Sequence, residues 1–218
     1  MKFRIKAFEN DIVISDSYNS IFIVKDNKLF AKICLSLNDY SYHLNDKEEI
    51  LNEKNIEVIN DIVTFDVNSK SLISLLYSKL ESTVESLDEY EGMFSANINS
   101  INSIFYDALD EFNIDFEYDK NISTLKYIKS LNVKFTSKFD SLYDKIIYIF
   151  EIYSELLNNK CLIFINTLNY FDTDQINNIL KYKNYKKLNV LFIENYLSYE
   201  NIDSKIFIID EDYYEYCI

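Results

Sequence analysis

The chain has 218 residues, a formal net charge of −14 at pH 7 and 48% hydrophobic residues. This length suits one compact domain or one domain with a sizeable insertion, and the hydrophobic content is enough for a core, which excludes a disordered acidic protein. The negative charge repels polyanions as a whole, so nucleic-acid binding needs a local basic face or bound cations.

The sequence contains a single glycine, Gly92, and no proline. Phosphate-binding loops such as GxGxxG and GxxxxGK[ST] need several glycines, because their backbone N–H groups must approach the phosphate closely. Ordinary nucleotide-binding motifs are therefore excluded.

The cysteines and the hydropathy pattern indicate the cellular setting. Cys34, Cys161 and Cys217 fit no disulfide framework or zinc pattern, which favours a reducing, cytoplasmic environment. No apolar run approaches the roughly 18 residues of a membrane span, so we expect no membrane association.

The first part of the chain is predicted to be β-structure. Short apolar runs at 12–14, 20–24 and 29–33 indicate strands, and Asp-Asn at 26–27 indicates a hairpin turn between two of them. The β-branched run at 56–65 predicts a buried strand.

The hydrophobic period becomes helical after residue 65. Residues 66–69 (Asp-Val-Asn-Ser) offer N-cap candidates, and leucines at helical spacing follow over 72–80. Further helices are predicted over 98–112, 122–131 and 139–157, and the last of these has the clearest apolar stripe in the chain.

The last part alternates strand and helix. Apolar runs at 161–165, 190–193 and 206–209 indicate strands, and 172–183 indicates a helix. Short buried strands separated by helices imply a parallel sheet. We therefore predict one α/β domain, formed by residues 1–68 and 137–218, into which a helical domain of residues 69–136 is inserted.

Two groups of residues are candidates for catalysis. His43 is the only histidine, and a hydrolytic triad would combine it with Ser41 or Cys34, but no nucleophile elbow surrounds it and a solvated loop histidine is favoured. The acidic run 210–212 follows a predicted strand, where acids hold metal in some nucleases. A solvated strand end is the favoured alternative.

Two acidic clusters lack any lysine or arginine. Like charges this close destabilise the fold unless something neutralises them. In the segment 115–119 acids alternate with aromatics, so an extended chain places three carboxylates on one face, and calcium takes six to eight oxygen ligands of this kind. Metal binding and a solvated acidic face both remain open. The clusters are Glu81, Glu85, Asp88, Glu89 and Glu91, and Asp107, Asp110, Glu111, Asp115, Glu117 and Asp119.

The segment 181–187 (Lys-Tyr-Lys-Asn-Tyr-Lys-Lys) is a basic cluster with interleaved tyrosines. This pattern fits phosphate binding. It fits equally well a helix C-terminus, where the helix dipole favours lysines.

Several segments together resemble one CRISPR-associated family. They are Ile59–Ser69, Glu117–Asp119 followed by Leu125–Val133, Leu162–Asn166, Leu191–Glu194 and Ile209–Tyr213. In their order and spacing, from about Ile56 to Tyr213, they are similar to the ring-forming DNA-binding subunit of type II-A CRISPR adaptation, the Csn-two family.

The resemblance implies a fold and a function. Members have an α/β head like that of P-loop ATPases, with a parallel-rich sheet and a degenerate nucleotide site, and an inserted helical leg. They form tetrameric rings, bind calcium and pass double-stranded DNA through the ring. They bind DNA ends without catalysis and act with the CRISPR integrase and effector nuclease in spacer acquisition, an antiviral defence.

The resemblance also suggests metal ligands. The family's calcium ligands cluster where Asp115, Glu117 and Asp119 lie, so these three are the expected ligands. The next predicted helix carries Lys126 and Lys129 at positions where a further carboxylate ligand would be useful to calcium. Asp110 or Glu111 would then complete the ligand set.

Lysines that face the ring's hole would contact phosphates without reading bases. The candidates are Lys47, Lys54, Lys70 and Lys79, which lie in or beside the polar loop and the first leg helix. Two alternatives remain open: a metal-dependent nuclease that uses Asp210, Glu211 and Asp212, and a protein-only scaffold that never binds DNA.

Overall fold

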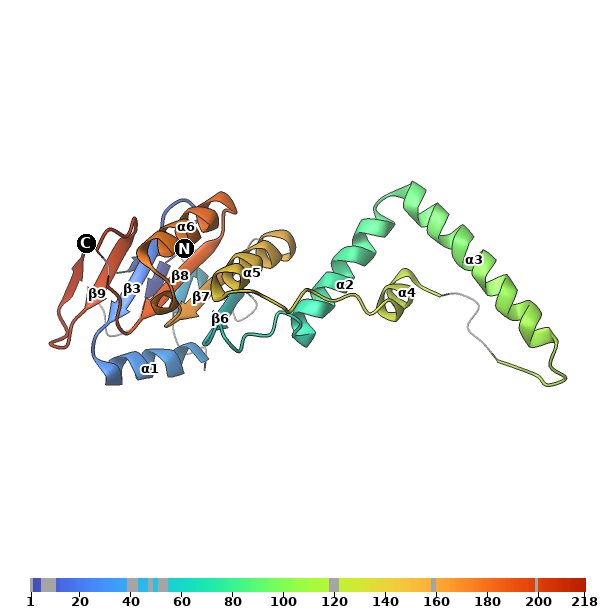
Figure 1. The fold of residues 1–218 in the computed structure, drawn as a ribbon, viewed down its shortest axis with the longest axis horizontal. Coiled ribbons are helices and arrows are strands. Elements are labelled where there is room, and N and C mark those ends of the chain that lie inside the picture. The colour runs from blue at the N-terminus through green and yellow to red at the C-terminus, as the bar shows by residue number, and fades with distance from the viewer. Residues whose placement is uncertain are drawn as a thin grey trace. The chain divides into compact units, whose positions relative to one another are not determined.

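The computed structural model describes residues 2–4, 11–38, 43–46, 49–50, 55–117, 122–157, 160–198 and 200–218. The chain forms two compact units. Residues 1–65 and 138–218 form one unit, called the head below, and residues 66–137 form the other, called the leg. We predicted domain boundaries after residues 68 and 136, and in the structure they lie after residues 65 and 137. Figure 1 labels the helices α1 to α6 and the main strands of the head.

The head is built on a six-stranded sheet in the order β10-β9-β3-β8-β7-β6. Five strands run parallel, and β10 pairs antiparallel with β9, so the predicted parallel-rich sheet is confirmed. Strand β10 was not predicted, because it is short and rich in acids and tyrosines. The strands are β3 (Ser20–Val24), β6 (Ile56–Ile59), β7 (Cys161–Ile165), β8 (Asn189–Glu194), β9 (Lys205–Ile209) and β10 (Glu215–Cys217).

Helices cover both faces of this sheet, because successive strand residues point to opposite sides. On one face, strand residues such as Phe22 and Ile193 share a core cluster with α1 (Asn27–Asn38). On the other, the Phe164 ring lies 5.9 Å from that of Phe150 in α5 and 5.3 Å from that of Phe192, measured between centroids. Helices α5 (Leu142–Leu156) and α6 (Thr173–Tyr185) lie on that face (Figure 1).

The strand predicted at 29–33 and the hairpin turn at 26–27 are wrong. This segment lies in α1, whose buried residues Leu29, Ile33 and Leu37 recur every four residues, the spacing of one helix face. The Asp26 carboxylate accepts a hydrogen bond from the Leu29 N–H at 2.7 Å and caps the helix. The short apolar run alone did not distinguish a buried strand from a helix.

The strand predicted at 56–65 is shorter in the structure, since β6 ends at Ile59. Asp61 then forms a turn: its carboxylate accepts from the Val63 N–H and the Thr64 hydroxyl, both at 2.8 Å. These hydrogen bonds lower the pKa of Asp61. A short polar side chain that bonds its own backbone competes with the strand ladder.

A second, antiparallel sheet in the order β2-β1-β4-β5 belongs to the head. Its strand β4 begins at His43, so the prediction of a loop at this histidine is wrong. The strands are β1 (Lys2–Arg4), β2 (Ile12–Val13), β4 (His43–Asp46) and β5 (Glu49–Ile50).

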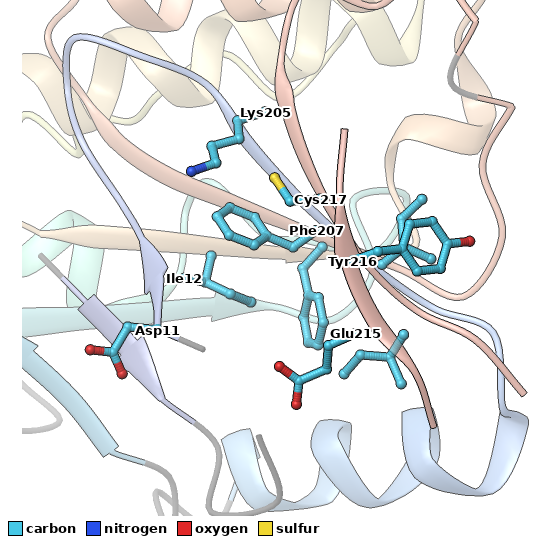
Figure 2. A pocket seen from close by; sticks show the side chains of 10 residues that line it. Asp11, Ile12, Lys205, Phe207, Glu215, Tyr216 and Cys217 are labelled. Carbon is cyan, nitrogen blue, oxygen red and sulfur yellow. The ribbon is translucent and has the colours of Figure 1, made fainter. Parts of the chain in front are cut away.

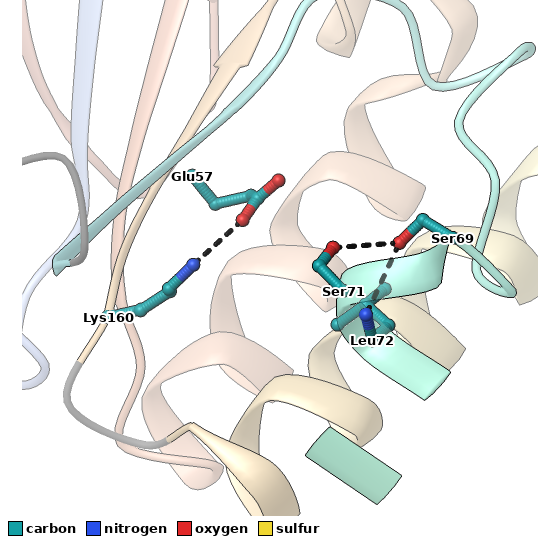
Figure 3. Close-up of polar contacts among 5 residues, drawn as sticks. All are labelled: Glu57, Ser69, Ser71, Leu72 and Lys160. Carbon is teal, nitrogen blue, oxygen red and sulfur yellow. Dashed lines mark hydrogen bonds and ion pairs between the residues drawn. The ribbon is translucent and has the colours of Figure 1, made fainter. Parts of the chain in front are cut away.

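The described residues of the leg form three helices, as the helical periodicity predicts: α2 (Lys70–Glu85), α3 (Asp88–Asp110) and α4 (Thr124–Ser130). Ser69 caps α2, and its hydroxyl accepts a hydrogen bond from the Leu72 N–H at 3.4 Å (Figure 3). Asn68 bonds both backbone groups of Phe135, at 3.0 and 2.9 Å. These bonds join the first and last segments of the leg.

Candidate nucleic-acid and metal sites

The described members of the predicted metal-ligand set lie at the end of α3 and in the segment that follows it. Asp110 and Asp115 line one hollow of about 400 Å³, together with Asn113 and apolar side chains. Glu111 and Glu117 are exposed outside its lining. Asp119 lies outside the described residues. The structure therefore brings together two of the five predicted carboxylates.

The hollow supplies fewer oxygen ligands than calcium takes. Asp110, Asp115 and the Asn113 side chain offer fewer groups than the six to eight oxygens of a calcium site. Across the described part of the chain, no group of three or more His, Cys, Asp or Glu side chains is placed to hold a metal. The described residues alone thus do not make a complete calcium site.

Two of the predicted DNA-contacting lysines are described by the structure. Lys70 begins α2, Lys79 lies nine residues later, and both are exposed. Nine residues are two and a half helical turns, so the two side chains leave opposite faces of α2. A duplex lying along one side of this helix would contact one of them. Lys47 and Lys54 lie outside the described residues.

The acidic run after β9 has a structural role. The Asp210 carboxylate accepts hydrogen bonds from the backbone N–H groups of Asp212 and Tyr214, at 3.0 and 2.9 Å. Tyr213 adopts a φ of 66° within this turn. Asp210 therefore stabilises the β9–β10 connection, and the geometry gives the nuclease alternative no support.

The hydrolytic alternative gains no support from the described residues either. Cys34 is half-buried in α1, and burial raises the pKa of its thiol to about 11. A thiol with so high a pKa is a poor nucleophile at neutral pH, because the thiolate is the reactive form. Ser41 lies outside the described residues.

The carboxyl ends of β3 and β8 lie where α/β sheets that bind nucleotides usually hold their ligands. These neighbouring strands continue in opposite directions across the sheet, which makes the gap between their ends the usual ligand site. Here Asn195 spans that gap, and its side-chain amide donates to the Val24 carbonyl at 2.8 Å. Only Lys25 and Asp26 separate β3 from α1. The chain's own groups thus occupy the position.

Glu194 ends β8 beside this gap and is fully buried. Its carboxyl accepts from the backbone N–H groups of Thr167 and Leu168, at 3.0 and 2.9 Å, and from the Asn169 side chain at 3.0 Å. Burial nevertheless raises the pKa of Glu194 to about 8. Sequence reasoning missed this residue, because an acid at a strand end usually lies in solvent.

Charge is distributed unequally between the two edges of the parallel sheet. Acids follow the strands at the carboxyl edge, whereas lysines precede or begin strands at the amino edge. Asp16 and Asp203 lie in loops at the amino edge, and Lys160 there pairs with Glu57 at 2.9 Å (Figure 3), so this edge is mixed rather than purely basic. The carboxyl-edge acids are Asp26, Asp61, Glu194 and Asp210, and the amino-edge lysines are Lys160, Lys187 and Lys205.

The basic cluster 181–187 forms the last turn of α6 and the residues after it, at this amino edge. Lys183 is buried, and its ammonium donates to the carbonyls of Ser15 and Tyr18. Burial lowers the pKa of Lys183 to about 8. Lys181, Tyr185 and Lys187 are exposed. One lysine of the cluster therefore anchors the helix and the others face solvent.

A second hollow of about 380 Å³ lies between β2 and the β9–β10 pair (Figure 2). Ile12, Phe22 and Phe207 contribute apolar surface, and the Lys205 ammonium lies 5.0 Å from the centroid of the Phe207 ring. None of the predicted site residues lines this hollow.

Comparison with known proteins identifies the family. The family model of the CRISPR-associated protein Cas_Csn2 matches residues 35–213. The chain belongs to the Cas_Csn2 family. The match includes every segment from which the resemblance was inferred.

Two relatives of this Cas_Csn2 chain match along nearly its whole length. The CRISPR-associated protein Csn2 of Streptococcus agalactiae is 26% identical over 98% of this chain and 96% of the relative. The Csn2 of Enterococcus faecalis is 25% identical over 98% and 97%. The chain is thus similar to complete members of the family.

The fold also has a solved counterpart. The crystal structure of Stu0660 of Streptococcus thermophilus is similar with a TM-score of 0.53 and 14% identity, covering 96% of this chain and 75% of that one. This likeness supports the fold alone. None of the described helices has the length and hydropathy needed to cross a bilayer.

Proposed function

We propose that this chain is a non-catalytic subunit that forms a tetrameric ring around double-stranded DNA and binds DNA ends during CRISPR spacer acquisition. The observation that carries the proposal is the Cas_Csn2 match over residues 35–213. The partners are the integrase and effector nuclease of a type II-A system, in the cytoplasm, and the biological role is antiviral defence.

The proposal includes a P-loop-ATPase-like head that has lost its nucleotide site. The parallel sheet supports it, and so does the contact between the Asp26 carboxylate and the N-terminus of α1. A helix N-terminus after a central strand normally attracts phosphate. Here an internal carboxylate takes that position and repels a phosphate, so the head serves as a scaffold rather than as an ATPase.

Apolar surface on α3 supports assembly. Ile104 and Phe105 are 67% and 63% exposed, and Phe112 just beyond the helix is 60% exposed. Large apolar side chains gathered on one element mark a protein–protein contact. Because the acids near this surface would repel those of a second copy, assembly is proposed to require calcium at the hollow of Asp110 and Asp115.

Two measurements test the proposal. The mass in solution, measured by light scattering with calcium and then with a chelator, should change from that of a tetramer to a smaller species. Gel-shift assays should show binding to linear duplex and none to a closed circle of the same length, because a ring threads only a free end. Equal binding to both topologies would contradict the ring, and a tetramer mass that the chelator leaves unchanged would contradict its dependence on calcium.

A further inference from the structure

The end of α6 carries an exposed surface of tyrosines and lysines that the proposed function leaves unassigned. This surface, called the α6 end patch, consists of Lys181, Tyr182, Tyr185, Lys186 and Lys187. Residues 181 and 185, and residues 182 and 186, are four apart and therefore neighbours on the helix surface. Lys187 follows directly, so the charges flank the two rings.

The aromatic part of the patch is accessible, and its two rings lie near each other. Tyr185 is 77% exposed, and its ring centroid lies 6.0 Å from that of Tyr182, with the ring planes 37° apart. The Lys186 ammonium lies 5.7 Å from the Tyr182 centroid, within the range of a cation–π contact. A flat aromatic surface beside ammonium groups is the arrangement that stacks a base and holds its phosphates.

The patch is anchored from beneath. The Tyr182 hydroxyl donates to the Glu151 carboxylate of α5 at 2.8 Å, and the buried Lys183 ammonium donates to the Tyr18 carbonyl at 2.9 Å. Lys187 has a φ of 54°, and its N–H donates to the Asn184 carbonyl at 3.1 Å, which ends the helix. Because these contacts already hold the patch in place, its side chains lose little conformational entropy when a ligand binds.

The charge of the head favours this position for a polyanion. The opposite, carboxyl edge of the sheet carries Asp26 and Asp210. Among the acids near the patch, Glu151 is bonded to Tyr182 and Asp16 acts on the buried Lys183. The exposed Lys181 and Lys187 therefore give the amino edge a local positive surface on a chain of net charge −14.

We propose that the α6 end patch binds an exposed base face flanked by phosphates, with the base stacked on Tyr185 and the phosphates on Lys181 and Lys187. A nucleic acid offers such a face at a duplex end or in an unpaired segment, and not within a duplex. The assignment rests on the proposed function, since it places part of the recognition of DNA ends on the head.

The test compares the full-length protein and its Tyr185→Ala variant on three DNAs: a blunt linear duplex, the same duplex with a single-stranded overhang, and a closed circle. Tyr185→Ala should weaken binding to the overhang duplex about tenfold and leave any closed-circle binding unchanged, and Tyr185→Trp should retain affinity. If Tyr185→Ala loses as much affinity for the blunt duplex, the terminal base pair is a ligand of the patch as well. Tyr196→Ala is the matched control, because Tyr196 is 72% exposed on the head, outside the patch.

Lysine variants test the phosphate contacts. Lys181→Gln and Lys187→Asn should each reduce the salt dependence of binding to the overhang duplex by about 0.7 to 0.9 in the logarithmic slope, and Lys28→Gln on α1 should not. If the lysines served only the helix dipole, these variants would lower the melting temperature and leave the slope unchanged, which overturns the proposal.

The remaining outcomes separate the two proposals. Wild-type protein that binds the overhang duplex with the same affinity as Tyr185→Ala overturns the patch and leaves the proposed function standing. Wild-type protein that binds an unpaired strand through Tyr185 but no duplex supports the patch and overturns the ring around duplex.

Discussion

The buried carboxyl of Glu194 lies 2.9 Å from the backbone nitrogen of Leu168, whose N–H donates to it. This hydrogen bond connects the carboxyl end of β8 to η2 (Leu168–Tyr170), the short helix that follows β7. Burial raises the pKa of Glu194 from 4.5 to about 8 although this hydrogen bond opposes the rise, and the stability of the head therefore depends on pH.

We expect the free energy of unfolding to fall as pH rises from about 4.5 to about 8. In this range the folded protein holds a proton on Glu194 that the unfolded chain has released, so folding becomes less favourable. Glu194→Gln keeps an acceptor for the N–H groups and should remove this decline, which is on the order of 5 kcal/mol for one group with such a shift. Urea unfolding at several pH values measures it. Glu155→Gln, an exposed change on α5, is the control. If the free energy of unfolding depended on pH in the same way in both variants, the expectation would be contradicted.

Lys183→Met should destabilise the head. The change removes the ammonium that donates to the Ser15 and Tyr18 carbonyls and deprives these part-buried acceptors of that donor, at a cost of about 1 to 3 kcal/mol. Chemical unfolding followed by circular dichroism measures the loss. Lys181→Met, two residues earlier on the exposed side of α6, should change stability by less than about 0.5 kcal/mol. Equal losses in both variants would show that the buried contacts contribute nothing specific.

Asp115→Asn should weaken calcium binding and the calcium-dependent change in mass. The substitution removes one negative charge from the hollow that Asp115 shares with Asp110 and keeps the size of the side chain. Calcium titration by calorimetry and light scattering are the measurements. Asp107→Asn removes an equal charge from an exposed position on α3 outside this hollow, so it should have little effect. A wild-type calcium response in Asp115→Asn would remove this residue from the ligand set.

Lys70→Gln and Lys79→Gln should differ in their effect on DNA binding. The two lysines leave opposite faces of α2, so a duplex along one side contacts one of them. Substitution of the lysine that faces the duplex should reduce the logarithmic salt slope by about 0.9 for each phosphate that its ammonium neutralises. Binding to linear duplex across a salt series measures this slope. Lys134→Gln, an exposed change elsewhere on the leg, is the control, and unchanged slopes in both α2 variants would exclude this helix from the interface.

The regular parts of the fold were predictable where the hydrophobic pattern is long. The stripe in α5 extends over four turns, and the run 161–165 is buried at every position, so period and length agree. The run 29–33 is too short for its period to distinguish a strand from a helix. The hydrogen bond from the Leu29 N–H to the Asp26 carboxylate fixes the start of the helix. Strand β10 escaped prediction, because its residues are largely exposed and form a strand only through pairing with β9.

The candidate sites were less predictable, because they depend on which residues meet in space. Asp110 and Asp115 share a hollow although a helix end separates them, whereas Lys70 and Lys79 share a helix and still diverge. The burial of Glu194 depends on the segment after β7, 26 to 27 residues away in the chain. Spacing along the chain carries no information on such contacts.

The two-residue connection between β3 and α1 has a consequence for how this head could evolve. Replacing Asp26 with glycine would remove the competing carboxylate but would not create room for a triphosphate, since a phosphate-cradling loop needs about six residues between strand and helix. A phosphate-binding loop between β3 and α1 would therefore require an insertion at this point, which single substitutions cannot supply.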